Sequence, residues 1–155
     1  MIDYISKQAK LNKAINEIMK ITICGSMSFA KEMLNTKNQL EKIGHICFVP
    51  ESTDDYAESK IEKISGSESA QRKITNNFIR KHYGLIINSD AILVLNHDKK
   101  GIKNYIGGNS LMEIGFAHVN NKKVFLLNPV PDLSYSDEIS AMTDVVLNGD
   151  LSKII

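Results

Sequence analysis

The sequence predicts an α/β fold in which helices cover both faces of a five-stranded, mainly parallel sheet. From residue 20 onward, short apolar runs alternate with helix-like segments, a pattern typical of parallel strands joined by crossover helices. Two of these runs, AILVLNH at 91–97 and KKVFLLNP at 122–129, are almost continuously apolar, as expected of strands that are buried on both faces.

The individual elements follow from the spacing of apolar residues along the chain. The first 19 residues place apolar side chains at helical spacing among lysines, which predicts an amphipathic helix before the first strand. Strands are expected at 20–25, 45–50, 91–97, 122–129 and, at a sheet edge, 144–149. Helices are expected at 28–42, 107–118 and 136–142. A further long helix is expected to begin at the capping box formed by Ser65 and Glu68 and to end at about Ile87. A polar loop is expected at 51–60. This order suits a flavodoxin-like, Rossmann-like three-layer sandwich with strand order 2-1-3-4-5.

Length and composition indicate one globular domain over residues 1–155, because 43% of the residues are hydrophobic and no tract is biased. Nineteen basic and eighteen acidic residues give a net charge of +1, which offers no field for nucleic acid or an anionic membrane. No apolar run approaches the roughly 20 residues of a spanning helix, and the start lacks a signal peptide, so a cytoplasmic protein is expected. Cys24 and Cys47 lack zinc-ligand spacing and are expected to be buried free thiols, with no metal site.

A ligand site is expected at the carboxyl ends of the strands, where the strand order reverses. The turn CGSMSF follows the first strand and leads into a helix, so its backbone N–H groups can face an anion at the helix N-terminus. It lacks the lysine of a Walker loop and the spaced glycines of a dinucleotide-binding fingerprint. Gly25 in this turn has two interpretations, a ligand contact or simply a tight turn.

Glu113 in the segment GGNSLMEIGFAH also has two interpretations. Ser110 and Glu113 have capping-box spacing, in which the glutamate reaches back to the N–H of the cap residue. The helix nevertheless follows a buried strand and a glycine pair, where a backbone can approach a ligand closely. A carboxylate in that place can act as a nucleophile toward an electrophilic sugar carbon.

His82 and Asp90 are further candidates. His82 lies on the core-facing stripe of the long predicted helix and is either a packed histidine or a proton donor and acceptor beside the site. Asp90 stands at the entrance to the third strand, where a structural turn role competes with a role in proton transfer. The other histidines show no metal-ligand spacing.

Taken together, these motifs resemble the nucleoside 2-deoxyribosyltransferase superfamily. The resemblance covers residues 20–148, a core that excludes the helix of residues 1–19, and is most specific in EIGFA at 113–117 followed by KKVFLL at 122–127. It implies that Glu113 is the nucleophile that attacks C1′ of the sugar and displaces the nucleobase. No cofactor is implied, and the expected partner is a nucleoside or nucleotide substrate.

One branch of that superfamily, the 2′-deoxynucleoside 5′-phosphate N-hydrolases, has counterparts of CGSMS and of ISAM at 139–142. Its similarity implies that Ser140 is offered to the phosphate in a neighbouring subunit, so a homodimer or higher oligomer is expected. The expected substrate-binding residues are Gly25, Ser26, Asp90, Gly107, Gly108, Asn109 and Ser140.

Two positions depart from the family pattern. The family has an aspartate eight residues before the strand-entry aspartate, where this chain has His82, and an aspartate or serine six residues before the nucleophile, where it has Gly107. The leading hypothesis is an N-glycosidic-bond hydrolase or deoxyribosyltransferase, with Glu113 and His82 as the catalytic residues. The alternatives are a non-catalytic nucleotide-binding module and, with a differently spaced glycine motif, a phosphoribohydrolase.

Overall fold

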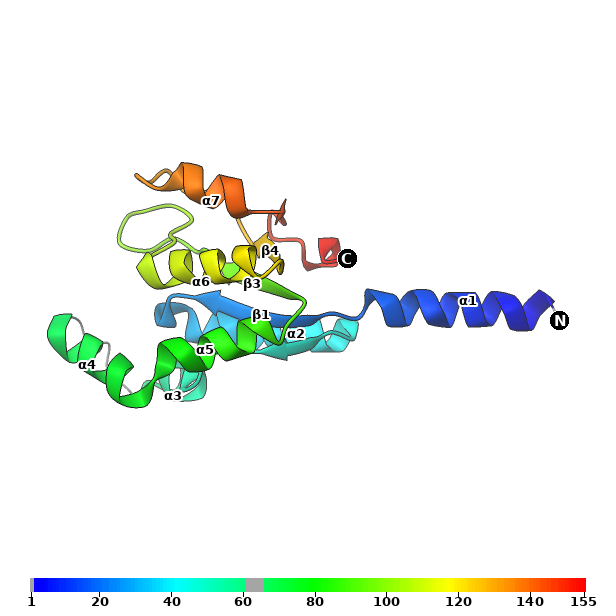
Figure 1. The fold of residues 1–155 in the computed structure, drawn as a ribbon, viewed down its shortest axis with the longest axis horizontal. Helices are drawn as coiled ribbons and strands as arrows, with labels where there is room; N and C mark the ends of the chain where they lie inside the picture. Colours follow the sequence, from blue (N-terminus) through cyan, green and yellow to red (C-terminus); the bar gives the residue numbers. More distant parts are fainter. Residues whose placement is uncertain (1, 61–65) are drawn as a thin grey trace.

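The computed structural model describes residues 2–60 and 66–155, and its sheet has the predicted topology. The five strands are β1 (Lys20–Gly25), β2 (Ile46–Phe48), β3 (Ala91–Leu95), β4 (Lys123–Leu126) and β5 (Val145–Val146). They are all parallel and lie in the order β2-β1-β3-β4-β5 (Figure 1). The order reverses between β1 and β3, where Gly25 and Leu95 are register partners at the carboxyl ends.

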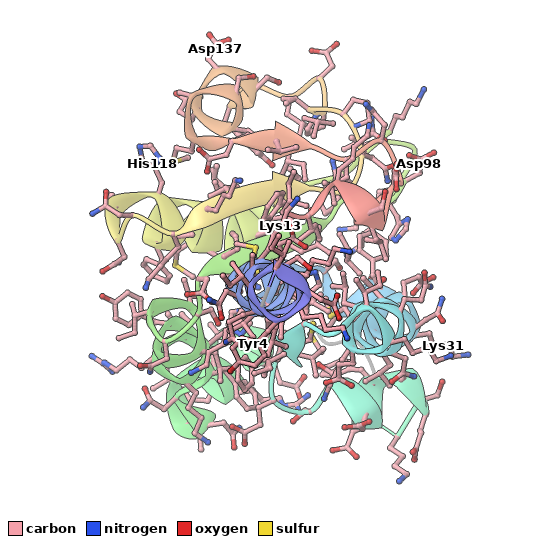
Figure 2. All side chains as sticks on the ribbon, turned by 90° about the vertical axis from the view of Figure 1, so that its right-hand side faces the viewer. Tyr4, Lys13, Lys31, Asp98, His118 and Asp137 are labelled. Atoms are coloured by element: carbon pink, nitrogen blue, oxygen red, sulfur yellow. The ribbon has the colours of Figure 1, made fainter. Side chains whose placement is uncertain are left out.

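Helices cover both faces of this sheet. The helices of the described residues are α1 (Ile2–Glu17), α2 (Ala30–Ile43), α3 (Thr53–Ala57), α4 (Gly66–Asn76), α5 (Phe78–Ile87), α6 (Gly108–Val119) and α7 (Ser136–Met142), with 3₁₀ turns η1 (Met27–Phe29) and η2 (Leu151–Lys153). Figure 2 looks along α1 and shows α5 and α6 on one side of the sheet and α2 on the other. The predicted three-layer α/β fold is therefore confirmed.

Two apolar cores lie on the two faces, because successive strand residues point to opposite sides. The core on the α2 side contains Ile21, Ile23, Met33, Leu40, Leu93, Leu95, Phe125, Leu147 and Ile154. The core on the α5–α6 side contains Cys24, Ile86, Ile92, Val94, Ile114, Val124, Leu126 and Ile139. Each fully buried side chain of leucine size contributes about 1.5–3 kcal/mol. The same alternation directs Cys24 toward α5 and α6.

Two predicted elements were wrong. The long helix ending near Ile87 is two helices, because Asn77 adopts a left-handed backbone with φ of 55° between α4 and α5; asparagine tolerates this conformation better than most residues. Its expected capping serine, Ser65, lies outside the described residues. The polar loop contains the short helix α3, whose first turn carries Asp54 and Asp55, where the helix dipole favours acidic side chains.

The predicted N-terminal helix is present as α1 and extends away from the sheet (Figure 1). Its apolar side chains are largely exposed, with Tyr4 at 72%, Leu11 at 54% and Ile15 at 55%. The helix is therefore an appendage to the core rather than a layer of it. Among the described residues, no helix is both long and apolar enough to cross a membrane.

Candidate functional site

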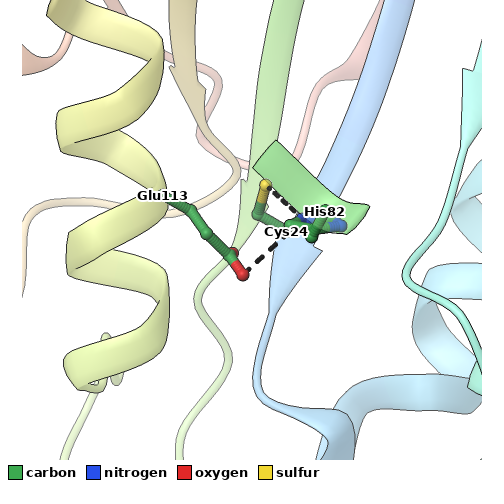
Figure 3. Close-up of side chains that lie close together, drawn as sticks. All are labelled: Cys24, His82 and Glu113. Carbon is green, nitrogen blue, oxygen red and sulfur yellow. Dashed lines mark hydrogen bonds and ion pairs between the residues drawn. The ribbon is translucent and has the colours of Figure 1, made fainter. Parts of the chain in front are cut away.

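Three side chains from three elements meet near the carboxyl end of β1, between α5 and α6 (Figure 3). His82 Nε2 lies 3.4 Å from Cys24 Sγ and 3.6 Å from Glu113 Oε1, and these three atoms all lie within 4.8 Å of one another. We refer to these residues as the Cys24–His82–Glu113 cluster. It brings together the two predicted catalytic residues and adds a thiol.

Glu113 reaches the cluster because α6 begins earlier than a capping box would require. The N-cap of α6 is Gly107 and its first helical residue is Gly108, so Ser110 lies inside the helix and is buried. Glu113 therefore sits in the second turn and points toward Cys24 and His82. The capping-box interpretation of Glu113 is excluded by this start of the helix.

His82 is held by the position of α5. The break at Asn77 starts a new helix, in which His82 and Ile86 are both buried on the side facing the sheet. Residues four apart share one helix face, so the packing of Ile86 in the core fixes His82 beside β1. His82 is 7% exposed.

Cys24 was predicted only as a buried free thiol, which the structure confirms. Its membership of the cluster was missed. Thr22 and Cys24 point to the same face of β1 by the period of two, and the Thr22 hydroxyl hydrogen-bonds that of Ser89 at 2.7 Å just after α5. The available signal was the position of Cys24 directly before Gly25, at the strand end where the site was expected.

Burial keeps the cluster uncharged near neutral pH. Loss of water raises the pKa of the Glu113 carboxyl from 4.5 to about 8, against the lowering effects of the Cys24 thiol and the Lys73 charge. Burial also lowers the pKa of His82 from 6.5 to about 4 and raises that of Cys24 well above its usual range. The contact between His82 and Glu113 therefore joins two neutral groups at pH 7, although its geometry would suit an ion pair.

Two polar atoms of the cluster remain unsatisfied. Glu113 Oε2 and His82 Nδ1 are buried and have no hydrogen-bond partner among the described residues. Leaving a buried polar atom without a partner costs about 1–3 kcal/mol. The cluster is therefore poised to interact with a further group.

The predicted substrate-binding turn at Gly25 and Ser26 carries a positive charge that sequence reasoning missed. Lys99 Nζ donates to Ser26 Oγ at 2.6 Å and lies 5.3 Å from the centre of the Tyr105 ring. Ser26 Oγ also accepts from the Ser28 N–H at the start of η1. A lysine beside the N-terminus of a helical turn is suited to an anion.

Gly107 has a local steric explanation. A Cβ at this position would lie 2.8 Å from Tyr105 Oη and 3.1 Å from its Cε1. The tyrosine ring therefore fills the space into which an aspartate or serine of the resembled family would project. The space beside Gly108 is open, and the Asn109 side chain accepts a hydrogen bond from Lys73 Nζ at 3.2 Å, which links α4 to the start of α6.

Two other predicted site residues are not brought to the cluster. Asp90 lies at the opposite, amino edge of the sheet, where its carboxylate accepts the Lys20 N–H at 2.8 Å and its own N–H donates to the Lys20 carbonyl. It therefore has the structural role that competed with proton transfer. Ser140 is exposed on α7, and its contact with a neighbouring subunit stays a prediction.

Two cavities of the structure lie away from the cluster. A cavity of about 310 Å³ lies on the α2 side, lined by residues that include Glu32, His97 and Asn128, and another of about 410 Å³ lies near the amino edge beside His118. Neither contains a residue of the cluster. Glu113 is nevertheless the accessible member, since its side chain is 15% exposed while Cys24 is fully buried.

No family model matches the chain, and no curated protein matches it either. The structure shows an α/β fold with a five-stranded parallel sheet in the order 2-1-3-4-5. The family resemblance rests on the motif residues alone.

Proposed function

We propose that the chain cleaves the N-glycosidic bond of a nucleoside or a nucleoside 5′-monophosphate, with Glu113 as the nucleophile. The observation that carries this proposal is the position of Glu113, a buried carboxyl in the second turn of α6 that faces His82 Nε2 at 3.6 Å instead of capping its helix. Parallel sheets of this kind bind ligands at the edge where Glu113 lies.

The reaction is a double displacement in which His82 moves the proton. Glu113 gives its proton to His82 Nε2, and the carboxylate attacks C1′ as the bond from C1′ to the base nitrogen breaks. The electron pair of that bond leaves with the base, which takes the proton from His82. Water then hydrolyses the glycosyl ester in a hydrolase, whereas a second base accepts the sugar in a transferase.

The protonation states of the empty cluster make the transfer of the Glu113 proton to His82 unfavourable until a substrate is bound. In the empty site both Glu113 and His82 are uncharged at pH 7, because burial raises the pKa of one to about 8 and lowers that of the other to about 4. The transition state carries positive charge at the sugar, which stabilises the carboxylate in a site from which water is excluded. The negative charge of the Glu113 carboxylate therefore forms beside the positively charged sugar of the transition state.

The turn at Gly25 and Ser26 supports a phosphorylated substrate. Lys99 brings a cation to Ser26 Oγ, and the N–H groups of the turn precede η1 and α2. A 5′-phosphate bound there favours the monophosphate hydrolase over the transferase. The shared oligomeric site with Ser140 and a cytoplasmic location belong to the same proposal.

A non-catalytic nucleotide-binding module is the second candidate. It is favoured by Gly107, because the Tyr105 ring occupies the place of the expected polar side chain, and by the 15% exposure of the Glu113 side chain. Such a module binds nucleotide without releasing base.

The test is base release from a panel of ribo- and deoxyribonucleosides and their 5′-monophosphates, followed by chromatography. We expect release by the wild type and by Glu138→Gln, a matched change of an exposed glutamate on α7. Release should be absent in Glu113→Gln. Tight nucleotide binding without release by the wild type would favour the binding module instead.

A further inference from the structure

We infer that the Cys24–His82–Glu113 cluster is a binding site for Zn²⁺, with Cys24 Sγ, His82 Nε2 and a Glu113 carboxylate oxygen as its three protein ligands. Binding itself does not depend on the proposed function. Its consequence does, because a cation on Glu113 occupies the carboxylate that would attack the sugar.

The distances within the cluster match a zinc site. Zinc is bound tetrahedrally at about 2.0–2.1 Å by nitrogen or oxygen and about 2.3 Å by sulfur, which places neighbouring ligand atoms roughly 3.3–3.6 Å apart. The separations from His82 Nε2 are 3.4 Å to Cys24 Sγ and 3.6 Å to Glu113 Oε1, and all three atoms lie within 4.8 Å. The third edge, from Cys24 Sγ to a Glu113 carboxylate oxygen, is at most 4.8 Å and shortens to about 3.6 Å when the ion binds.

The donor set also fits zinc chemically. Thiolate, neutral imidazole and carboxylate are all ligands that zinc accepts, and three protein ligands leave a fourth position for water or a substrate oxygen. The Glu113 side chain is the most exposed of the three ligands at 15%, whereas the Cys24 side chain is fully buried.

Charge balance favours the bound state in this buried place. One thiolate and one carboxylate neutralise a divalent cation, so the complex carries no net charge and its burial costs little. Binding releases the thiol proton of Cys24 and the carboxyl proton of Glu113 to solvent, whereas His82 is already neutral. The Lys73 ammonium on α4 opposes the cation, but it is engaged with Asn109.

An unsatisfied carboxylate oxygen provides a second, independent observation. Glu113 Oε2 is buried without a partner in the part of the chain that the structure describes. A cluster maintained only by hydrogen bonds would leave that carboxylate oxygen unused, whereas a cation can be shared by both carboxylate oxygens. The geometry therefore points to a ligand rather than to packing alone.

The experiment uses Co²⁺ alone as a spectroscopic probe of the full-length chain after chelator treatment. We expect one Co²⁺ per chain, with a near-ultraviolet band from thiolate to cobalt and visible bands of tetrahedral coordination, all removed by Zn²⁺. Cys24→Ser should lose the thiolate band, while Cys47→Ser, which changes the other buried cysteine, should keep it. Glu113→Gln should keep the thiolate band but bind Co²⁺ roughly tenfold more weakly or worse.

Absence of the band in folded wild type, its persistence in Cys24→Ser or its loss in folded Cys47→Ser would each overturn the inference. If Cys24→Ser does not fold, as judged by circular dichroism, His82→Gln replaces it and must weaken Co²⁺ binding by roughly tenfold or more; unchanged affinity would overturn the inference too. Base release by the chelated protein is measured separately. Its absence alongside an intact cobalt spectrum would count against the proposed function and leave the metal site standing.

Discussion

Carboxylates at the two edges of the same sheet have opposite environments. At the amino edge, Asp90 accepts the Lys20 N–H at 2.8 Å and Asp144 accepts the Val124 N–H at 2.7 Å, so each fixes the start of a strand. At the carboxyl edge, the Glu113 carboxyl meets the side chains of His82 and Cys24, and one of its oxygens has no partner among residues 2–60 and 66–155. The comparison indicates that carboxylates bound by main-chain donors are structural, whereas burying Glu113 with an unpartnered oxygen costs stability.

The largest expected effect is on activity. Under the proposed function, Glu113→Gln lowers base release by roughly 10⁴-fold, as the loss of a nucleophile does in other enzymes. The amide has nearly the shape of the carboxyl but cannot form the glycosyl ester. The matched change at the other edge, Asp90→Asn, should leave the activity of the folded protein within a few fold. Equal losses of kcat/KM in both variants would contradict the assignment of a catalytic role to Glu113 and a structural role to Asp90.

The second prediction concerns stability and pH. Glu113 has a pKa raised from 4.5 to about 8 in the folded chain, so the folded state holds a proton that the unfolded state has lost, and stability falls as pH rises between those values. His82, with its pKa lowered to about 4, acts in the opposite direction but only below pH 6.5.

Thermal unfolding between pH 6.5 and pH 8 therefore isolates Glu113. We expect the wild type to lose stability relative to Glu113→Gln across this range, by about 1.5–2 kcal/mol. The same scan of Glu138→Gln should stay parallel to the wild type. A constant difference between wild type and Glu113→Gln across the range would mean that the Glu113 carboxyl is not held protonated by burial.

A third, smaller effect tests the amino edge. Asp90→Ala removes the acceptor of the Lys20 N–H and should lower the free energy of unfolding by about 1–3 kcal/mol. Denaturant titration measures this loss. Asp150→Ala, which removes a local cap of an exposed 3₁₀ turn, provides the comparison and should cost less. A larger loss of unfolding free energy in Asp150→Ala than in Asp90→Ala would contradict the structural role assigned to Asp90.

The smallest effect concerns crowding beside the site. Gly107→Ala places a Cβ against the hydroxyl end of the Tyr105 ring, which can move aside, and should cost about 1 kcal/mol or less. Gly108→Ala meets open space and should be neutral or slightly stabilising, because alanine is the better helix former. Adding Tyr105→Ala to Gly107→Ala should recover most of the loss. Equal stability of the two single variants in denaturant titration would show that the ring does not fill this space.

The fold was predictable because its signals are local. Almost continuous apolar runs mark β3 and β4, and helix-like segments between the strands require parallel crossovers. The break at Asn77 was not predictable, since an asparagine can continue a helix or adopt a left-handed backbone and the side-chain pattern of the segment is the same in both cases. The α3 helix was missed because its acidic sequence resembles a polar loop.

The candidate site was predictable only in part. The setting of Glu113 after a buried strand, together with the family resemblance, identified it and His82, which the structure brings together. Cys24 was missed because its contact depends on the face of β1 that α5 covers, a property of tertiary packing. Tyr105 was missed for a similar reason, since its loop folds the ring back onto Gly107.

The most direct test of the central claim is the mass of the intact protein after rapid quenching with a substrate from the base-release panel. If Glu113 is the nucleophile, the wild type gains the mass of one sugar or sugar phosphate, and peptide mapping places the adduct on Glu113. Glu113→Gln should show none. Base release by the wild type with the adduct on another residue, or base release by Glu113→Gln at the wild-type rate, would contradict the account.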